Sequence, residues 1–155
     1  MSNKISASDV KKLRELTGAR ILDCKKALEK SNGDIKKAQQ HVEEKGLARA
    51  EKSADRETKV GYIASYVHTT GMMASMVELL CETDFVAKNE DFRKMANNIA
   101  MQVVAMNPKD VNELLSQDYI RDPEITVETL VKKLSGKIGE KMVVNRILRF
   151  EVGEK

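Results

Sequence analysis

Several residue types that mark particular classes of protein are scarce in this sequence. Its 155 residues include no tryptophan and only two prolines, two histidines and two cysteines. Cys24 and Cys81 cannot form the disulfide framework of a secreted domain, and both lie among apolar neighbours, so we expect buried, reduced thiols in a cytoplasmic protein. With no cluster of Cys and His residues, the sequence predicts no metal site.

Long hydrophobic segments are also missing. The longest apolar runs, such as residues 99–105, contain polar side chains and are far shorter than the roughly 20 residues of a membrane-spanning helix. The N-terminal residues contain no apolar signal core, so nothing indicates secretion. We therefore expect no contact with membranes.

Catalytic motifs are the third absence. The chain has no phosphate-binding loop, no dinucleotide-binding fingerprint and no nucleophile elbow. Acidic residues are plentiful, but no pair lies in an evidently apolar segment where a pKa could be tuned. His41 and His68 are interpreted as surface residues. The sequence thus predicts no catalytic residue and no cofactor, which favours a protein that works by contact with a partner.

The charge that is present is divided unevenly along the chain. The formal net charge is +3, but residues 1–59 carry 15 basic and 10 acidic side chains, whereas residues 60–155 carry 12 basic and 14 acidic ones. Helix-forming residues dominate the first part, and β-branched and aromatic residues alternate at the start of the second. We therefore predict an N-terminal domain of residues 1–54 and a core domain of residues 55–155.

The N-terminal domain is predicted to be a bundle of three short helices. Ser8 and Asp34 are suitable N-caps, and a glycine follows each helical pattern, where it can end the helix in a left-handed conformation. The expected helices cover residues 9–17, 20–30 and 35–45, with Gly46 ending the third and a further helix over residues 47–56.

The core domain is predicted to be α+β. Two segments with strand character flank Thr69-Thr70-Gly71, which is typical of a β-hairpin. Helical spacing and the cap Thr126 indicate two helices. The expected strands cover residues 62–68, 73–82 and 143–152, the expected helices residues 84–107 and 127–138, and a less regular stretch residues 111–123. A three-stranded antiparallel sheet backed by helices is the natural assembly.

Two short segments are candidates for partner binding. Ile21 and Leu22 start a predicted helix and point about 100° apart, so a small bundle cannot fully bury both. The second segment joins a strand to a helix, with Thr83 as N-cap and Asp84 at the positive helix terminus. Physical reasoning alone favours Phe85 as a core residue there, and the alternative is an exposed helix tip that projects a carboxylate and an aromatic ring together.

Both segments resemble the elongation factor Ts family. The first resemblance is carried by residues 10–19 (VKKLRELTGA) and 23–28 (DCKKAL), the second by residues 81–89 (CETDFVAKN), and a third by residues 137–140 (KIGE), 143–144 and 149–151. The matches follow the family's order and span nearly the whole chain.

The resemblance implies a function and a set of contact residues. Elongation factor Ts is the guanine-nucleotide exchange factor of elongation factor Tu, the GTPase that delivers aminoacyl-tRNA to the bacterial ribosome. The family begins with a ubiquitin-associated-like three-helix domain that docks on the GTPase domain of Tu, and a second element contacts that domain near the nucleotide's magnesium site. The matching positions here are Arg14, Ile21, Leu22 and Lys25 in the first element and Thr83, Asp84, Phe85 and Val86 in the second. On this basis Phe85 is an exposed contact residue, and the protein is not an enzyme.

The chain also departs from the family pattern. Arg20-Ile21-Leu22 replaces a run of a small residue followed by methionines, and the interval after Asn107-Pro108 is shorter than in the family. Because one three-stranded sheet leaves a face or edge uncovered, we expect a homodimer through the core sheet. Its interface would use the face of the last strand predicted to carry Val144, Leu148, Phe150 and Val152.

Two other functions stay open. A shortened core could leave a helical-bundle adaptor that binds a GTPase or another partner without exchange. The basic first part could bind RNA, but acidic residues are interspersed there and no aromatic stacking platform accompanies them, so we expect no direct contact with nucleic acid.

Overall fold

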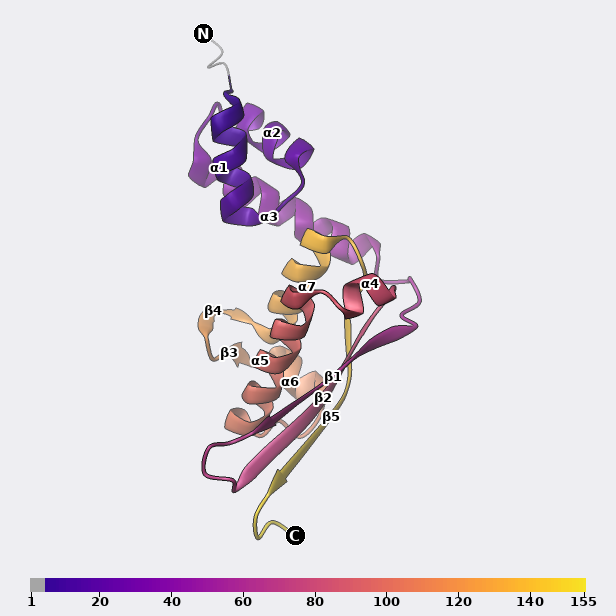
Figure 1. Cartoon of the computed structure of the whole chain (residues 1–155). Helices are drawn as coiled ribbons and strands as arrows, with labels where there is room; N and C mark the ends of the chain where they lie inside the picture. Colours follow the sequence, from indigo (N-terminus) through magenta and orange to yellow (C-terminus); the bar gives the residue numbers. More distant parts are fainter. Residues whose placement is uncertain (1–4) are drawn as a thin grey trace.

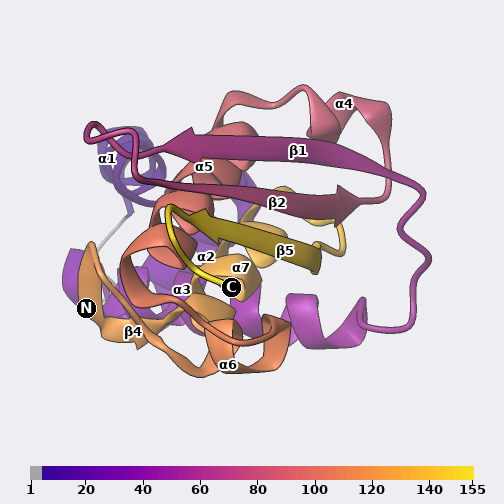
Figure 2. The same cartoon turned by 90° about the horizontal axis from the view of Figure 1, so that it is seen from below.

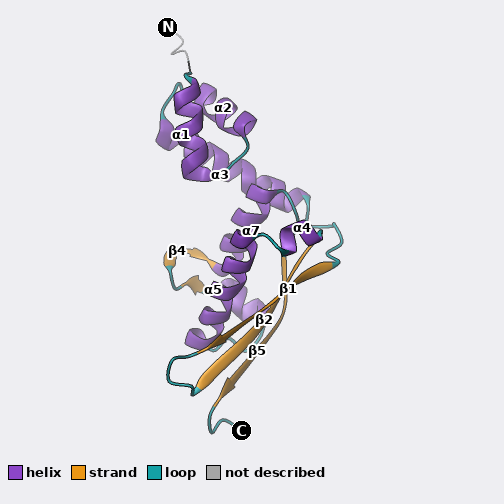
Figure 3. Cartoon of the chain, in the orientation of Figure 1, coloured by secondary structure: helices purple, strands orange, loops and turns teal. Residues whose placement is uncertain are grey.

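The computed structural model describes residues 5–155 and places a helical bundle at one end of an elongated molecule and a β-sheet at the other (Figures 1 and 3). The helices are α1 (Ala7–Thr17), α2 (Ile21–Lys30), α3 (Ile35–Lys52), α4 (Asp84–Ala87), α5 (Glu90–Met106), α6 (Val111–Ser116) and α7 (Val127–Ile138). The strands are β1 (Val60–Val67), β2 (Met73–Cys81), β3 (Asp118–Tyr119), β4 (Asp122–Thr126) and β5 (Val143–Glu151).

The bundle of α1, α2 and the first half of α3 encloses a small core of Leu13, Ala19, Cys24, Ala27, Leu28 and Ala38. The N-cap of α1 is Ser6, and the predicted cap Ser8 is wrong. Ser6 and Asp9 form a capping box, in which each side chain accepts a hydrogen bond from the backbone N–H of the other. A capping box requires a side-chain acceptor three residues after the cap. Asp9 is that acceptor for Ser6, whereas the residue three positions after Ser8 is Lys11, which cannot accept.

The third helix is longer than predicted. It continues through Gly46 to Lys52 as one helix, so the predicted end at Gly46 and the separate helix after it are wrong. The physical reason lies in α7, whose Gly136 packs directly on the backbone of Gly46. A methyl group on Gly136 would overlap the Gly46 carbonyl, so the two helices approach as closely as glycine allows. Packing against α7 thus stabilises a helix that glycine alone would weaken.

The sheet confirms the predicted α+β fold class. β2 pairs with β1 on one side and with β5 on the other, and both pairs are antiparallel. Figure 2 shows the three strands in front of α5 and α7. The core lies between these layers, where Phe92, Ile99 and Val103 of α5 are fully buried in one cluster with Val77 and Leu79 of β2.

Two regions of the core domain differ from the prediction. The expected helix over residues 84–107 is two helices, because Asn89 interrupts it and caps α5 by accepting a hydrogen bond from the Phe92 N–H. The stretch over residues 111–123 contains α6 and the first part of the β3–β4 hairpin, which continues to Thr126. Gln102 is fully buried and holds the hairpin through hydrogen bonds to the Asp118 carbonyl and from the Ile120 N–H.

The last strand contains a β-bulge that the periodicity did not predict. Glu78 of β2 pairs with Arg146 and Leu79 pairs with Val144, which leaves Asn145 unpaired. The bulge reverses the alternation of side chains along β5. Val144 therefore faces the core and is 5% exposed, whereas Phe150 faces outward and is 67% exposed. The prediction that these two side chains share a face is wrong.

No helix within residues 5–155 is long and apolar enough to cross a membrane. Over the same residues, no three Cys, His, Asp or Glu side chains come together in a group that could hold a metal ion.

Candidate partner-binding site

The connection between β2 and α4 forms an exposed tip. β2 ends at Cys81, and Thr83 caps α4 by accepting a hydrogen bond from the Val86 N–H at 3.5 Å. The Phe85 side chain is 89% exposed, the largest value among the exposed large hydrophobic residues. The core position that physical reasoning alone favoured for Phe85 is therefore wrong, and both Asp84 and Phe85 are exposed on one short helix.

Val86 has a different place from its neighbours. Its side chain is 8% exposed and joins the hydrophobic core beside Ala87. The structure thus brings Thr83, Asp84 and Phe85 to the surface and uses Val86 as the anchor that attaches the tip to the core.

The Cys81 thiol below the tip is buried, and Cys24 is buried in the bundle, as predicted. Burial raises the pKa of Cys81 to about 11, and the nearby Glu140 carboxylate adds to the effect. A thiol with such a pKa stays protonated near neutral pH and is a poor nucleophile.

A second exposed surface lies on the bundle. Ile21 is 55% exposed and Leu22 is 69% exposed, in agreement with the argument that a small bundle cannot bury both. Arg14, Ile21 and Lys25 line a shallow groove between α1 and α2, together with Ile5, Ser6, Ala7, Val10 and Lys11. Neither Arg14 nor Lys25 forms an ion pair with another of the residues 5–155. The groove is therefore an apolar surface bordered by positive charges that are available to a partner.

Arg20, which we expected to depart from the family pattern, does not line this groove. It precedes α2 as the N-cap residue without a side-chain capping bond, and its guanidinium lies against Gly139 at the end of α7. Arg20 thus provides a contact between the bundle and the residue that follows α7.

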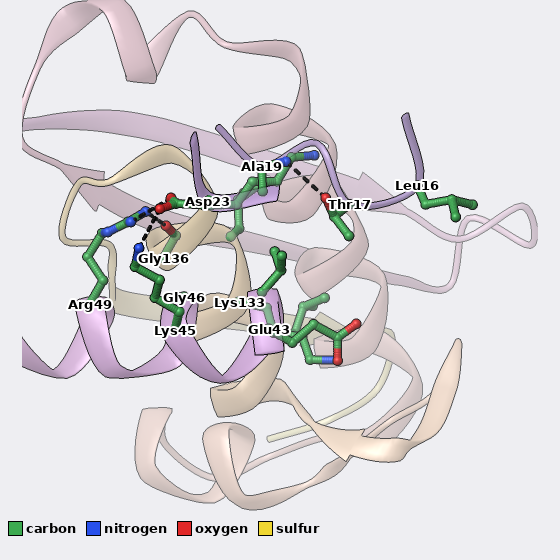
Figure 4. Close-up of a pocket in the computed structure, with 14 residues that line it drawn as sticks. Leu16, Thr17, Ala19, Asp23, Glu43, Lys45, Gly46, Arg49, Lys133 and Gly136 are labelled. Carbon is green, nitrogen blue, oxygen red and sulfur yellow. Dashed lines mark hydrogen bonds and ion pairs between the residues drawn. The ribbon is translucent and has the colours of Figure 1, made fainter. Parts of the chain in front are cut away.

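A pocket of about 290 Å³ is lined by residues of the bundle and of α7, beside the place where α3 packs on α7 (Figure 4). One wall carries Asp23, whose carboxylate accepts hydrogen bonds from Lys45 at 2.5 Å and from Arg49 at 2.8 Å. Burial by itself would raise the pKa of Asp23, but the two cationic donors outweigh burial and hold the pKa below its usual range. Arg49 also donates to the Gly136 carbonyl at 3.0 Å. This network joins α2, α3 and α7, so it orients the bundle relative to the core.

Comparison with known proteins identifies the family. Residues 82–155 match the family model described as elongation factor TS. The elongation factor Ts of Moorella thermoacetica is 38% identical over an alignment that covers 97% of this chain and 96% of that protein. The chain belongs to the elongation factor Ts family. The predicted family is thereby confirmed.

Other elongation factor Ts proteins show the same likeness and differ in length. The protein of Thermotoga neapolitana is 40% identical over 98% of this chain and 99% of its own length. That of Aquifex aeolicus is 47% identical over 97% of this chain, which spans 54% of the Aquifex protein. The alignments to the Moorella and Thermotoga proteins extend over 195 positions, which the 155 residues of this chain cannot fill. These relatives therefore carry residues within the matched region that this chain does not have.

Proposed function

We propose that this protein is a guanine-nucleotide exchange factor that binds elongation factor Tu and promotes the release of GDP, so that GTP can bind, during translation elongation in the cytoplasm. The observation that carries the proposal, beside family membership, is the 89% exposure of Phe85 on a helix tip that the core anchors. A large aromatic ring in water has no stabilising role within the monomer, whereas it is the type of side chain that dominates binding energy at interfaces.

Two surfaces have separate roles in this mechanism. The bundle surface that carries the groove residues Arg14, Ile21 and Lys25 and the exposed Leu22 docks on the GTPase domain and supplies affinity. The tip with Asp84 and Phe85 enters near the magnesium site and displaces elements that hold the nucleotide. Each 1.4 kcal/mol of this coupling changes the nucleotide's affinity about tenfold. Linkage is reciprocal, so GTP in turn weakens the binding of the exchange factor. No covalent bond changes, so the protein needs no catalytic residue and no cofactor.

We further propose the division into a docking domain of residues 1–54 and a core domain of residues 55–155. The two separate hydrophobic clusters support it, because one lies within the bundle and the other between the sheet and its helices. Each cluster then holds one contact surface in place, the bundle surface in the first case and the tip in the second.

We also propose a homodimer through the core sheet. α5 covers one face of β1 and β2, and Figure 1 shows no element of residues 5–155 over the opposite face. The side chains on that face include large, half-exposed apolar residues: Ile63, Val67, Met76, Leu148 and Phe150. Contiguous apolar surface of this kind is typical of an interface, and a second copy of the same face would cover it.

The exchange function is tested by release of a fluorescent GDP analogue from elongation factor Tu. We expect the unaltered protein to accelerate release strongly. Phe85→Ala should reduce the acceleration about tenfold or more, the effect of losing a dominant aromatic contact. Arg14→Ala should mainly raise the concentration needed for half-maximal effect. Met106→Ala is the matched control, because this exposed side chain lies at the end of α5, outside both surfaces.

The adaptor is the second candidate function, and the residues missing from the matched region favour it. Under this alternative the protein binds elongation factor Tu but leaves the rate of GDP release unchanged. Binding without acceleration by the unaltered chain would therefore replace exchange with the adaptor function.

The homodimer is tested by Phe150→Asp. The side chain is exposed in the monomer, so the fold should survive, whereas a carboxylate buried in the interface should weaken self-association at least about tenfold. Sedimentation equilibrium measures the change, and Leu22→Asp on the exposed bundle surface is the control. Val144→Asp does not test the interface, because Val144 faces the core. A Phe150→Asp protein that remains a dimer would contradict the proposed interface.

A further inference from the structure

We propose that Glu140 is a positioning residue that holds the Thr83–Phe85 tip in the orientation needed for exchange. The inference rests on the proposed exchange function and adds to it a residue outside both contact surfaces. Glu140 lies in the loop between α7 and β5, 57 residues away from Thr83 in the sequence. Figure 1 shows this loop passing next to α4.

The Glu140 carboxylate accepts three hydrogen bonds from the start of the tip. Its Oε2 atom accepts from the backbone N–H groups of Glu82 and Thr83, each at 3.1 Å. Its Oε1 atom accepts from the Thr83 hydroxyl at 2.5 Å. Hydrogen bonds to an ionised acceptor are stronger than those between neutral groups. One side chain therefore fixes both the backbone and the capping side chain at the point where β2 turns into α4.

A reciprocal bond completes the arrangement. The Glu82 carboxylate accepts a hydrogen bond from the Lys141 N–H at 2.7 Å. Glu82 thus binds the backbone of the loop that carries Glu140, and Glu140 binds the backbone of the loop that carries Glu82. The Thr83 hydroxyl that donates to Glu140 also accepts from the Val86 N–H. Glu140 thus determines the direction of the hydroxyl that caps α4. We call Glu82, Thr83, Glu140 and Lys141 the loop clamp.

The tip needs this support because it has little structure of its own. α4 contains only four residues, far too few for a stable isolated helix. Phe85 is exposed and cannot orient the helix by packing, so the buried Val86 and Ala87 are its only apolar anchors. Without the clamp the tip would stay attached but would sample many directions, and binding would have to order it.

The loop that carries Glu140 is itself held in place. The Ser135 hydroxyl donates to the Glu140 carbonyl at 2.6 Å, and Arg56 donates to the Gly139 carbonyl at 3.3 Å. The Arg20 guanidinium lies against Gly139 from the side of the bundle. Glu140 therefore connects the tip to a loop that is itself fixed at the end of α7.

The first test compares Glu140→Ala and Glu140→Gln with the unaltered protein in the GDP-release assay. We expect Glu140→Ala to reduce the maximal rate at saturation about tenfold, because a misdirected contact group loses much of its effect even when binding persists. The half-saturating concentration should change less, since the bundle groove is intact. Glu140→Gln keeps one oxygen acceptor and should be intermediate. Glu124→Ala, an exposed carboxylate on β4, should be neutral.

A double-mutant cycle distinguishes positioning from general destabilisation. If Glu140 acts through the tip, Glu140→Ala should have less than about a twofold further effect when Phe85 is already alanine, because coupled residues are not additive. An equal loss of rate in both backgrounds would overturn the proposal.

Hydrogen–deuterium exchange tests the clamp without elongation factor Tu. In Glu140→Ala the amides of Glu82, Thr83 and Val86 should exchange at least about tenfold faster, while those in the middle of α5 should be unchanged. Unchanged protection at the tip would refute the clamp. If the unaltered protein does not accelerate GDP release, the exchange function fails, but this measurement still decides whether Glu140 orders the tip.

Discussion

The bundle and the sheet domain differ in how much core they have. The hydrophobic cluster of the bundle contains six buried residues, of which Leu13 and Leu28 are the largest, whereas the cluster of the sheet domain contains eighteen, including Phe92 and Ile99. A core of six residues gives little stability by itself. The bundle instead extends its third helix along α7 and joins it through Gly46, Arg49 and Gly136. The part of the molecule that carries the tip therefore also holds the bundle, and with it the proposed docking groove, in place.

The largest effect is expected for Leu13→Ala in the bundle. Truncating this fully buried side chain should cost about 3 kcal/mol, which is enough to unfold a six-residue core while the sheet domain stays folded. Hydrogen exchange should then lose protection in α1 and α2 and keep it in α5 and β2. Val103→Ala in the sheet core is the control, and its effect should spread through the sheet domain. Simultaneous loss of protection in both regions after Leu13→Ala would show one cooperative unit instead of two.

A smaller effect is expected at the junction between the two regions. Gly136→Ala places a methyl group on the Gly46 carbonyl, so α3 and α7 must separate at a cost of about 1–3 kcal/mol. Thermal unfolding and affinity for elongation factor Tu should both decline. Gly46→Ala is a matched control, because its methyl group would be only in ordinary contact with Gly136, at 3.8 Å, and alanine favours the helix. Equal damage from both substitutions would contradict the asymmetric packing.

The smallest effect is expected for the dependence of the bundle's stability on pH. The pKa of Asp23 is lower in the folded protein than its usual value of 3.8, so the unfolded chain binds the proton more tightly. The stability that its bonds to Lys45 and Arg49 supply is therefore complete above pH 3.8 and is lost as the pH falls through the lower, folded pKa. Protection of the bundle amides should follow this titration. Asp23→Asn should remove this pH dependence of the protection. Asp118→Asn, at an exposed position of β3, should leave it unchanged.

Much of the fold and part of the candidate site could be predicted from the sequence. The β1–β2 hairpin, the helices around Leu13 and Leu28, and the Thr126 cap of α7 follow from turn residues, periodicity and capping. The exposure of both Ile21 and Leu22 follows from their adjacency on a short helix. The position of Phe85 could not be derived in this way, because strand-end and helix-start rules allow the ring to point either inward or outward. Only the family resemblance indicated that it is exposed.

The sequence by itself determined where most elements begin and end, because caps, turns and periodicity depend on residues within about four positions of one another. It also determined the family. Tertiary structure decided the features that depend on distant partners: Gly136 allows α3 to continue through Gly46, and the register between β2 and β5 turns Val144 inward and Phe150 outward. It also decided the direction of the tip, because the group that holds Thr83 is a carboxylate 57 residues away, and no local pattern in the sequence indicates that pairing.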